Sequence, residues 1–137
     1  MLVSTRGRYA LRMMIDLAAH TEDGFVALKD IAERQQISKK YLEQIIPVLT
    51  RSSLLMTTRG FQGGYKLARP ASDYTVGEIL RVTEGTMAPV NCLMGEENVC
   101  PRKAVCATLP LWTGLQKVVD DYLDKITLQD VLDGKLI

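Results

Sequence analysis

The sequence predicts a mostly α-helical protein that carries one small β-hairpin. Apolar residues recur with the helical period of about 3.6 residues in several stretches of the chain. Two short β-prone runs flank a single glycine-containing turn. With 137 residues, of which 47% are hydrophobic and 24% charged, the chain has the size and composition of about one globular domain.

Three helices are predicted before the hairpin. The first covers about Thr5 to His20, because apolar side chains share one stripe and arginines occupy other faces. The second covers Leu28 to Gln35. A tight turn leads to the third, which begins after Ser38, since serine is a favoured N-cap residue. Pro47 lacks a backbone N–H and crowds the preceding turn, so we expect this helix to kink or end there.

The hairpin consists of the runs LLMTTR and YKLAR around the loop GFQGG. This loop is longer than the two residues of the commonest hairpins, and its glycines favour a reversal of the chain. Three helices and a hairpin, with basic residues at the third helix and at the hairpin tip, describe a winged helix-turn-helix. We predict this unit over residues 1–70.

Residues 71–137 are predicted to hold a short helix, a loop, a long helix and a last short helix. The pattern Thr75-Val-Gly-Glu78 is typical of a capping box and opens the first of these, to about Thr83. The loop covers residues 91–106. Pro110 suits the first position of the long helix, which runs to about residue 126, and Thr127 opens the last one. We expect the first helix of the chain to pack on this region too.

The long helix carries a wide apolar stripe. The stripe either packs into the chain's own core or, if exposed, requires a partner. Twofold-symmetric DNA readers hold two recognition helices about one turn of B-DNA apart, ~34 Å, and a long pairing helix could set that distance. A homodimer with a C-terminal dimerisation helix would cover the stripe, and packing into the chain's own core is the alternative. The predicted interface residues are Trp112, Leu115, Val119, Tyr122, Leu123 and Ile126.

Charge is distributed unevenly along the chain. Residues 1–69 contain 11 Lys and Arg against 6 Asp and Glu, a balance of +5, whereas residues 70–137 contain 6 against 10, a balance of −4. A basic front half suggests contact with a polyanion such as double-stranded DNA.

The residues at the start of the third helix suit a DNA major groove, which takes short polar or basic side chains at the N-terminal end of a recognition helix. Gln44 can pair with an adenine edge, whereas the Glu43 carboxylate tolerates chiefly cytosine amino groups. An arginine at the hairpin tip suits a narrow minor groove. Alternatively, the lysines form a solvated face and the glycines only a turn. The predicted DNA-binding residues are Ser38, Lys39, Lys40, Tyr41, Glu43, Gln44, Arg59, Gly60, Gly63 and Gly64.

All three cysteines, Cys92, Cys100 and Cys106, lie within one sixteen-residue stretch. Four interpretations are open: one disulfide with a spare thiol, structural zinc, inert thiols, or an iron–sulfur cluster. Zinc sites usually have four ligands and close C-x2-C pairs, which this stretch lacks. Thiolates on a flexible loop suit an iron–sulfur cluster.

Other features bear on compartment and activity. No secretory signal is recognisable, and the most apolar stretch, Leu11–Ala19, is too short and too charged to span a membrane. We expect a cytoplasmic protein, and disulfides are rare in the cytoplasm. The sequence has no nucleophile–base set or phosphate-binding loop, so we do not expect an enzyme.

A family resemblance covers almost the whole chain. Taken in order, the segments that carry it are STRGRYALRMMIDLA, IAERQQISKKYLEQI, RGFQGGYKLARP, TVGEILRVTEG and ITLQDVL. Together they resemble the IscR-type branch of the Rrf family of bacterial winged-helix regulators. The resemblance implies a homodimeric transcriptional regulator, acting on iron–sulfur cluster assembly genes, with a labile cluster in the loop before the long helix.

The resemblance also implies site residues. Those matching Ser38, Lys40, Glu43 and Gln44 lie at the major groove, and those matching Arg59 and its glycines form the wing. The cluster, [2Fe–2S] in preference to [4Fe–4S], is expected on the three cysteines.

The fourth cluster ligand is not apparent. IscR-type proteins commonly carry histidine at the position of Leu109, and other members an acidic residue near Arg8. His20, Glu96 or Glu97, a small molecule and a partner-subunit residue remain as alternatives. Other functions also stay open: a repressor of the same fold that responds to nitric oxide, redox state or cysteine metabolism, or a structural-zinc module.

Overall fold

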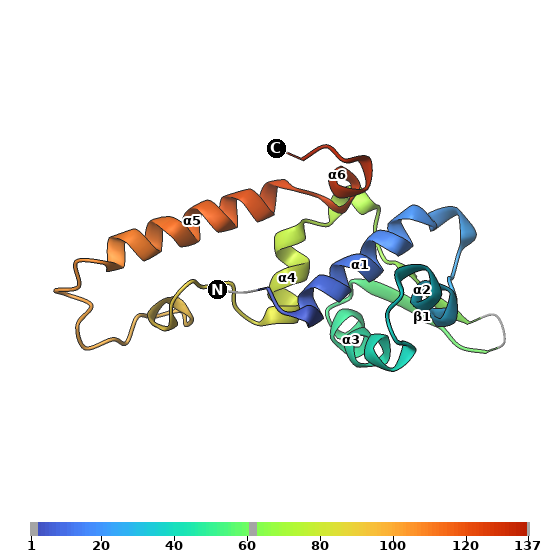
Figure 1. The fold of residues 1–137 in the computed structure, drawn as a ribbon, viewed down its shortest axis with the longest axis horizontal. Coiled ribbons are helices and arrows are strands. Elements are labelled where there is room, and N and C mark those ends of the chain that lie inside the picture. The colour runs from blue at the N-terminus through green and yellow to red at the C-terminus, as the bar shows by residue number, and fades with distance from the viewer. Residues whose placement is uncertain (1–2, 61–62, 137) are drawn as a thin grey trace.

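The computed structural model describes residues 3–60 and 63–136. It is mostly helical, with one two-stranded antiparallel sheet in the described residues (Figure 1). This confirms the predicted fold class. The elements are α1 (Thr5–Ala19), α2 (Leu28–Gln35), α3 (Lys39–Arg51), β1 (Leu55–Thr58), β2 (Gly64–Leu67), α4 (Val76–Glu84), α5 (Leu109–Lys125) and α6 (Leu128–Asp133), with 3₁₀ turns at Thr21–Asp23, Ala71–Asp73 and Asn91–Leu93.

The core is built around α1, which contacts α2, α3, α4, α6 and β2. Its apolar stripe is fully buried at Met13, Met14 and Leu17. Because α4 and α6 follow residue 70 and still pack on α1, the two predicted units share one core. The fully buried side chains around α1 include Ile31, Leu42, Ile45, Leu49, Leu54, Tyr74, Ile79 and Leu128.

The helix α3, which is predicted to read DNA, differs from the prediction at Pro47. The helix does not end there and continues to Arg51. Ile46 and Leu49 on either side of the proline are buried, so tertiary packing holds the last turn in place. The Thr50 hydroxyl also donates to the carbonyl of Ile46 at 3.0 Å. Of the predicted kink or early end at Pro47, the early end is therefore wrong, and the kink stays a prediction.

The hairpin pairs Leu55 with Leu67 at one end and Thr58 with Gly64 at the other. The segment around Val26 pairs with strand β2. The backbone groups of Val26 and Tyr65 exchange two hydrogen bonds, of 2.8 and 2.9 Å. Gly64 is buried at this junction, and a Cβ there would lie 2.3 Å from the Val26 carbonyl oxygen. The prediction that Gly64 contacts DNA is corrected accordingly: its place is inside the fold, where only glycine fits.

Capping residues begin the helices of the second half. Thr75 accepts from the backbone N–H of Glu78 at 3.0 Å, but no return bond from the Glu78 carboxylate completes the predicted box among the described contacts. At α6, Thr127 and Asp130 form a complete capping box. The predicted short helices therefore begin where expected.

The long helix α5 runs from α6 away from α2, α3 and the hairpin, and the loop that joins it to α4 extends outward on the same side (Figure 1). None of its 17 residues is buried. Arg81 of α4 ties it down through Asp120 at 2.9 Å and Asp124 at 2.6 Å. Within the described residues, no helix combines the length and apolar character that crossing a membrane requires.

Candidate DNA-binding surface and cysteine loop

The recognition helix presents one face to the core and the other to solvent. Its predicted base- and phosphate-contacting residues Ser38, Lys39, Lys40, Glu43 and Gln44 are all exposed. The Ser38 hydroxyl accepts from the backbone N–H of Tyr41 at 3.1 Å, which fixes the start of the helix. The exposed start of α3 is therefore rigidly positioned by the buried face behind it.

Tyr41 is half-buried and holds α3 against α1. Its ring meets Tyr9 edge to face, with centroids 5.3 Å apart. The guanidinium of Arg12 lies 5.1 Å from the Tyr9 ring centroid. Tyr41 therefore contributes to the position of the recognition helix as well as bordering its exposed surface.

At the wing, Arg59 and Gly60 are exposed. Gly60 has φ +104°, which favours glycine, and its carbonyl accepts from the Gly63 N–H at 2.9 Å. A Cβ on Gly63 would lie 2.6 Å from the Thr58 carbonyl oxygen, so this glycine permits the turn to close. The predicted tip of the wing includes residues 61 and 62, which lie outside the described residues.

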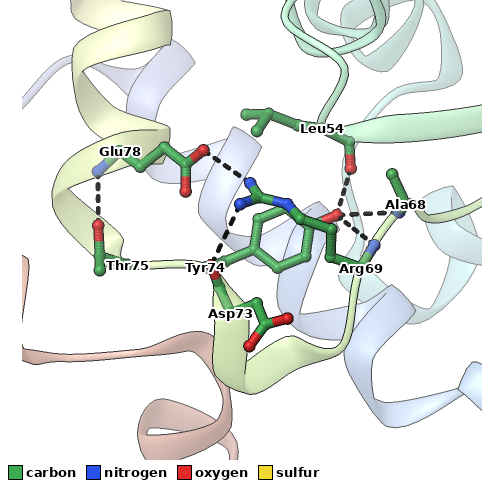
Figure 2. A network of polar contacts seen from close by, with 7 residues as sticks. All are labelled: Leu54, Ala68, Arg69, Asp73, Tyr74, Thr75 and Glu78. Atoms are coloured by element: carbon green, nitrogen blue, oxygen red, sulfur yellow. Dashed lines mark hydrogen bonds and ion pairs between the residues drawn. The ribbon is translucent and has the colours of Figure 1, made fainter.

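A buried tyrosine connects the base of the wing to α4 (Figure 2). The Tyr74 hydroxyl donates to the Leu54 carbonyl at 2.7 Å and accepts from the backbone N–H groups of Ala68 and Arg69 at 2.9 and 3.1 Å. The Arg69 guanidinium stacks 4.3 Å from the Tyr74 ring centroid and pairs with Glu78 at 2.6 Å. The start of β1, the end of β2 and the first turn of α4 thus share one polar network.

A second polar network fixes α2 on α1. Asp16 is buried and accepts two hydrogen bonds from Arg34, at 2.7 and 3.0 Å, and one from Gln35 at 3.0 Å. Burial alone would raise the pKa of Asp16, but these hydrogen bonds and the charge of Arg34 outweigh it and hold that pKa below its ordinary value. Asp16 is therefore an anionic anchor inside the helix-turn-helix.

The cysteine loop is irregular apart from its 3₁₀ turn, and Cys92, Cys100 and Cys106 are all free and partly exposed. In the described parts of the chain, no three His, Cys, Asp or Glu side chains form a group that could hold a metal ion. A hollow of about 270 Å³ lies between Leu93, Met94 and Glu96 of the loop and the facing sides of α4 and α5. The three free thiols therefore lie on a loop that borders this hollow.

The Cys106 thiol has a distinct environment. Its Sγ lies 3.4 Å from the Thr108 hydroxyl. This hydrogen bond, with backbone N–H groups of Thr108 and Leu109 and the charge of Arg102, lowers the pKa of the Cys106 thiol.

The residues considered for the fourth cluster ligand lie at different distances from the cysteine loop. His20 caps the end of α1, with Nδ1 2.7 Å from the Asp16 carbonyl oxygen, and that end of α1 lies far from the loop (Figure 1). Arg8 donates to the Thr5 hydroxyl at 2.9 Å. Glu96 and Glu97 are exposed within the loop itself.

The apolar residues of α5 form two adjacent stripes. Trp112, Val119 and Leu123 are partly buried. Ile126 is buried among Val76, Leu80 and Met87, so its predicted place in a dimer interface is corrected to the core of its own chain. The exposed stripe contains the predicted Leu115 and Tyr122, and also Leu111 and Val118, which sequence reasoning missed. These four side chains are between 39% and 65% exposed.

Comparisons with known proteins identify the family. Residues 3–134 match the Rrf2 family model, described as an iron-dependent transcriptional regulator. The chain is 44% identical to Protein rrf2 of Nitratidesulfovibrio vulgaris, over 96% of this chain and 87% of that protein.

Two solved structures are similar over nearly the whole chain. IscR of T. potens has a TM-score of 0.78 and 41% identity, covering 98% of this chain and 88% of that one. CymR, the global cysteine regulator of B. subtilis, has a TM-score of 0.79 and 35% identity, covering 97% of both chains.

The relatives bear on activity as well as fold. They are named as regulators of transcription and not as enzymes, which confirms that expectation. IscR of Pectobacterium carotovorum, 36% identical over 98% of this chain and 81% of that protein, is named an HTH-type transcriptional regulator. This helix-turn-helix class implies DNA binding, in agreement with the exposed face of α3. The chain belongs to the Rrf2 family of winged-helix transcriptional regulators.

Proposed function

We propose that this chain is a cytoplasmic regulator whose choice of promoters depends on an iron–sulfur cluster held by Cys92, Cys100 and Cys106, and which acts on cluster assembly genes. The observation that carries the proposal is the presence of all three cysteines, free and partly exposed, on one loop of a chain that matches an iron-dependent family. Thiolates are the usual protein ligands of such clusters, so the donor chemistry fits. When bound, the group would supply a labile cross-link between three positions of the loop.

The arrangement of the chain supports a link between the loop and the DNA-binding surface. The loop leaves the end of α4, and the first turn of α4 pairs with the base of the wing through Glu78 and Arg69. The end of α4 also meets α1, where Glu84 accepts from the Ser4 hydroxyl at 2.7 Å. Gathering the thiols would restrain the loop and favour one position of α4 relative to the wing. Such a ligand shifts the balance by its difference in affinity for the two arrangements.

We further propose that the protein is a homodimer that pairs through the exposed stripe of α5. Leu111, Leu115, Val118 and Tyr122 follow one another at intervals of four, three and four residues, as in the seam of paired helices. Leu11, Ile15 and Val131 line an apolar groove of about 430 Å³ on α1 and α6, which suits helix 1 as a second part of the dimer contact.

The cluster is tested by anaerobic reconstitution with iron and sulfide. Wild-type protein should develop visible absorbance with a fixed iron-to-chain ratio, and each of Cys92→Ala, Cys100→Ala and Cys106→Ala should lower it strongly. Asn91→Ala in the same loop serves as the matched control. Full iron and sulfide content in all three cysteine variants would exclude the thiols as ligands.

The promoter choice is tested by DNA selection from a random library with the holo and apo forms. We expect the two forms to select different sequence sets, with Glu43→Ala broadening the selection because a carboxylate no longer excludes bases other than cytosine. Arg59→Ala should weaken binding at fixed salt. Identical selections by both forms would reject cluster control while leaving DNA binding intact.

A second candidate is a repressor that responds directly to thiol chemistry or cysteine metabolism. It is favoured by the three free, partly exposed thiols, by the hydrogen bond of the Cys106 thiol to Thr108 that lowers its pKa, and by the similarity to a cysteine regulator. Exposing DNA-bound protein in parallel to nitric oxide, to peroxide and to an iron chelator distinguishes the two. Release by peroxide from metal-free protein would favour the second candidate.

A further inference from the structure

The arginines of the chain divide into two groups by their contacts. Arg34, Arg69 and Arg81 pair with carboxylates within the chain. Arg12 contacts Gln35, and Arg8 contacts Thr5. In the described part of the chain, the guanidinium groups of the remaining arginines, Arg6, Arg51, Arg59 and Arg102, have no carboxylate within 4.0 Å.

Among this second group, Arg6 lies against the recognition helix. It lines a cleft of about 110 Å³ together with Tyr41, Gln44 and Ile45 of α3. Arg6 is exposed, and so is Gln44. The contact between Tyr9 and Tyr41 fixes α1 on α3 one turn further along, so the position of Arg6 beside Gln44 is set by the core.

We infer that Arg6 extends the DNA-binding surface from α3 onto the first turn of α1 by contacting a backbone phosphate next to the base that Gln44 meets. The cleft is far smaller than the ~300 Å³ of small-molecule pockets, and the exposed Gln44 of α3 lines it. A phosphate oxygen is an anion of suitable size, and arginine can meet it with two parallel N–H groups. The inference rests on DNA binding by this family, but not on the iron–sulfur cluster.

A phosphate at the start of α1 would be bound by the Arg6 guanidinium and not by the N-terminal end of the helix. The Glu84 carboxylate already accepts from the backbone N–H of Ser4 at 3.0 Å and from its hydroxyl at 2.7 Å. It therefore neutralises the positive end of the α1 dipole and leaves that helix end unsuited to an anion. Arg6 provides a phosphate contact that carries no base preference of its own.

The experiment measures dissociation constants of the full chain for a selected operator and for an unrelated duplex over a range of salt concentrations. Arg6→Ala should weaken binding about five- to tenfold at ~0.1 M salt on both duplexes and lower the slope of log K against log salt by about 1. Arg6→Lys should retain most of the slope, because the charge remains.

Arg51→Ala is the matched control, since Arg51 is also exposed and without a carboxylate partner, but lies at the far end of α3. It should leave the slope unchanged. If Arg6→Ala binds with the wild-type slope, or if Arg51→Ala lowers the slope equally, the inference is overturned while DNA binding stands. If the folded wild-type chain binds neither duplex, both the family function and the inference fail.

Discussion

The helix α1 and the helix α5 are of similar length but differ in what holds them. Seven of the 15 residues of α1 are buried, whereas none of the 17 residues of α5 is. The recognition helix and the wing are positioned by the core around α1 and by the Asp16 and Tyr74 networks. The cysteine loop and α5 have few such constraints. The predicted DNA-binding residues of α3 and the wing therefore lie on a packed core within one chain, whereas no residue of α5 is buried.

The largest effect is expected from the exposed stripe of α5. Replacing Leu115 and Val118 together by Asp should convert a dimer into a monomer, because two carboxylates per chain would be buried in the interface. Operator affinity should fall by about a hundredfold or more, since the second recognition helix no longer binds as part of the same molecule. Sedimentation and operator titration measure both.

Thr113→Asp is the control for that substitution. Thr113 is exposed on α5 and lies two residues from Leu111, or about 200° around the helix. The variant should remain dimeric. If the stripe variant stays a dimer with wild-type mass, α5 is not the pairing helix.

The next effect tests the half of the molecule that is packed around α1. Asp16→Asn should lower the free energy of unfolding by about 3 kcal/mol at neutral pH, because a buried carboxylate that accepts three hydrogen bonds is replaced by an amide that faces the same donors. Urea denaturation provides the value. Asp121→Asn breaks the exposed pair with Lys117 in α5 and should leave the midpoint unchanged. Equal losses in both variants would contradict the contrast between the two halves.

Much of the fold could be predicted because its signals are local. Ser38 begins α3 and Thr127 begins α6 through hydrogen bonds three residues along the chain. The end of α3 could not be predicted from Pro47, since buried contacts distant in sequence keep the last turn helical. Helical periodicity also placed Ile126 in the same stripe as Leu115, whereas the packing of α5 on α4 puts the first inside and the second outside.

The candidate DNA-binding surface could likewise be predicted only where its signals are local. The exposed residues of α3 follow from its amphipathic pattern. The burial of Gly64 depends on the close approach of Val26, which no local pattern indicates. Likewise Tyr74 has no periodic signal, and its role depends on groups at Leu54 and Arg69 that only the tertiary fold brings together.

A smaller effect is expected at this tyrosine. Tyr74→Phe should cost about 1–2 kcal/mol, because it leaves the Leu54 carbonyl and two backbone N–H groups without their partner. Thermal unfolding measures the loss. Tyr65→Phe is the control, because the Tyr65 hydroxyl makes no hydrogen bond among the described contacts, and this variant should unfold like the wild type. A Tyr74→Phe variant with wild-type stability would show that the network does not support the wing.

The smallest effect is the pH dependence of the Asp16 anchor. Its folded pKa is lowered, so its contribution is fully present above the ordinary carboxyl pKa of about 3.9 and is lost as pH falls through the lower, folded value. The stability difference between wild type and Asp16→Asn should therefore be constant from about pH 7 to pH 5 and shrink below about pH 4. Urea titrations across this range test it. His20 Nδ1 lies 3.8 Å from the carboxylate, so the series is repeated with His20→Gln in both proteins. A stability difference that grows as pH falls would mean that the folded protein favours the protonated Asp16 carboxyl group. Asp16 would then not act as an anionic anchor of the half packed around α1.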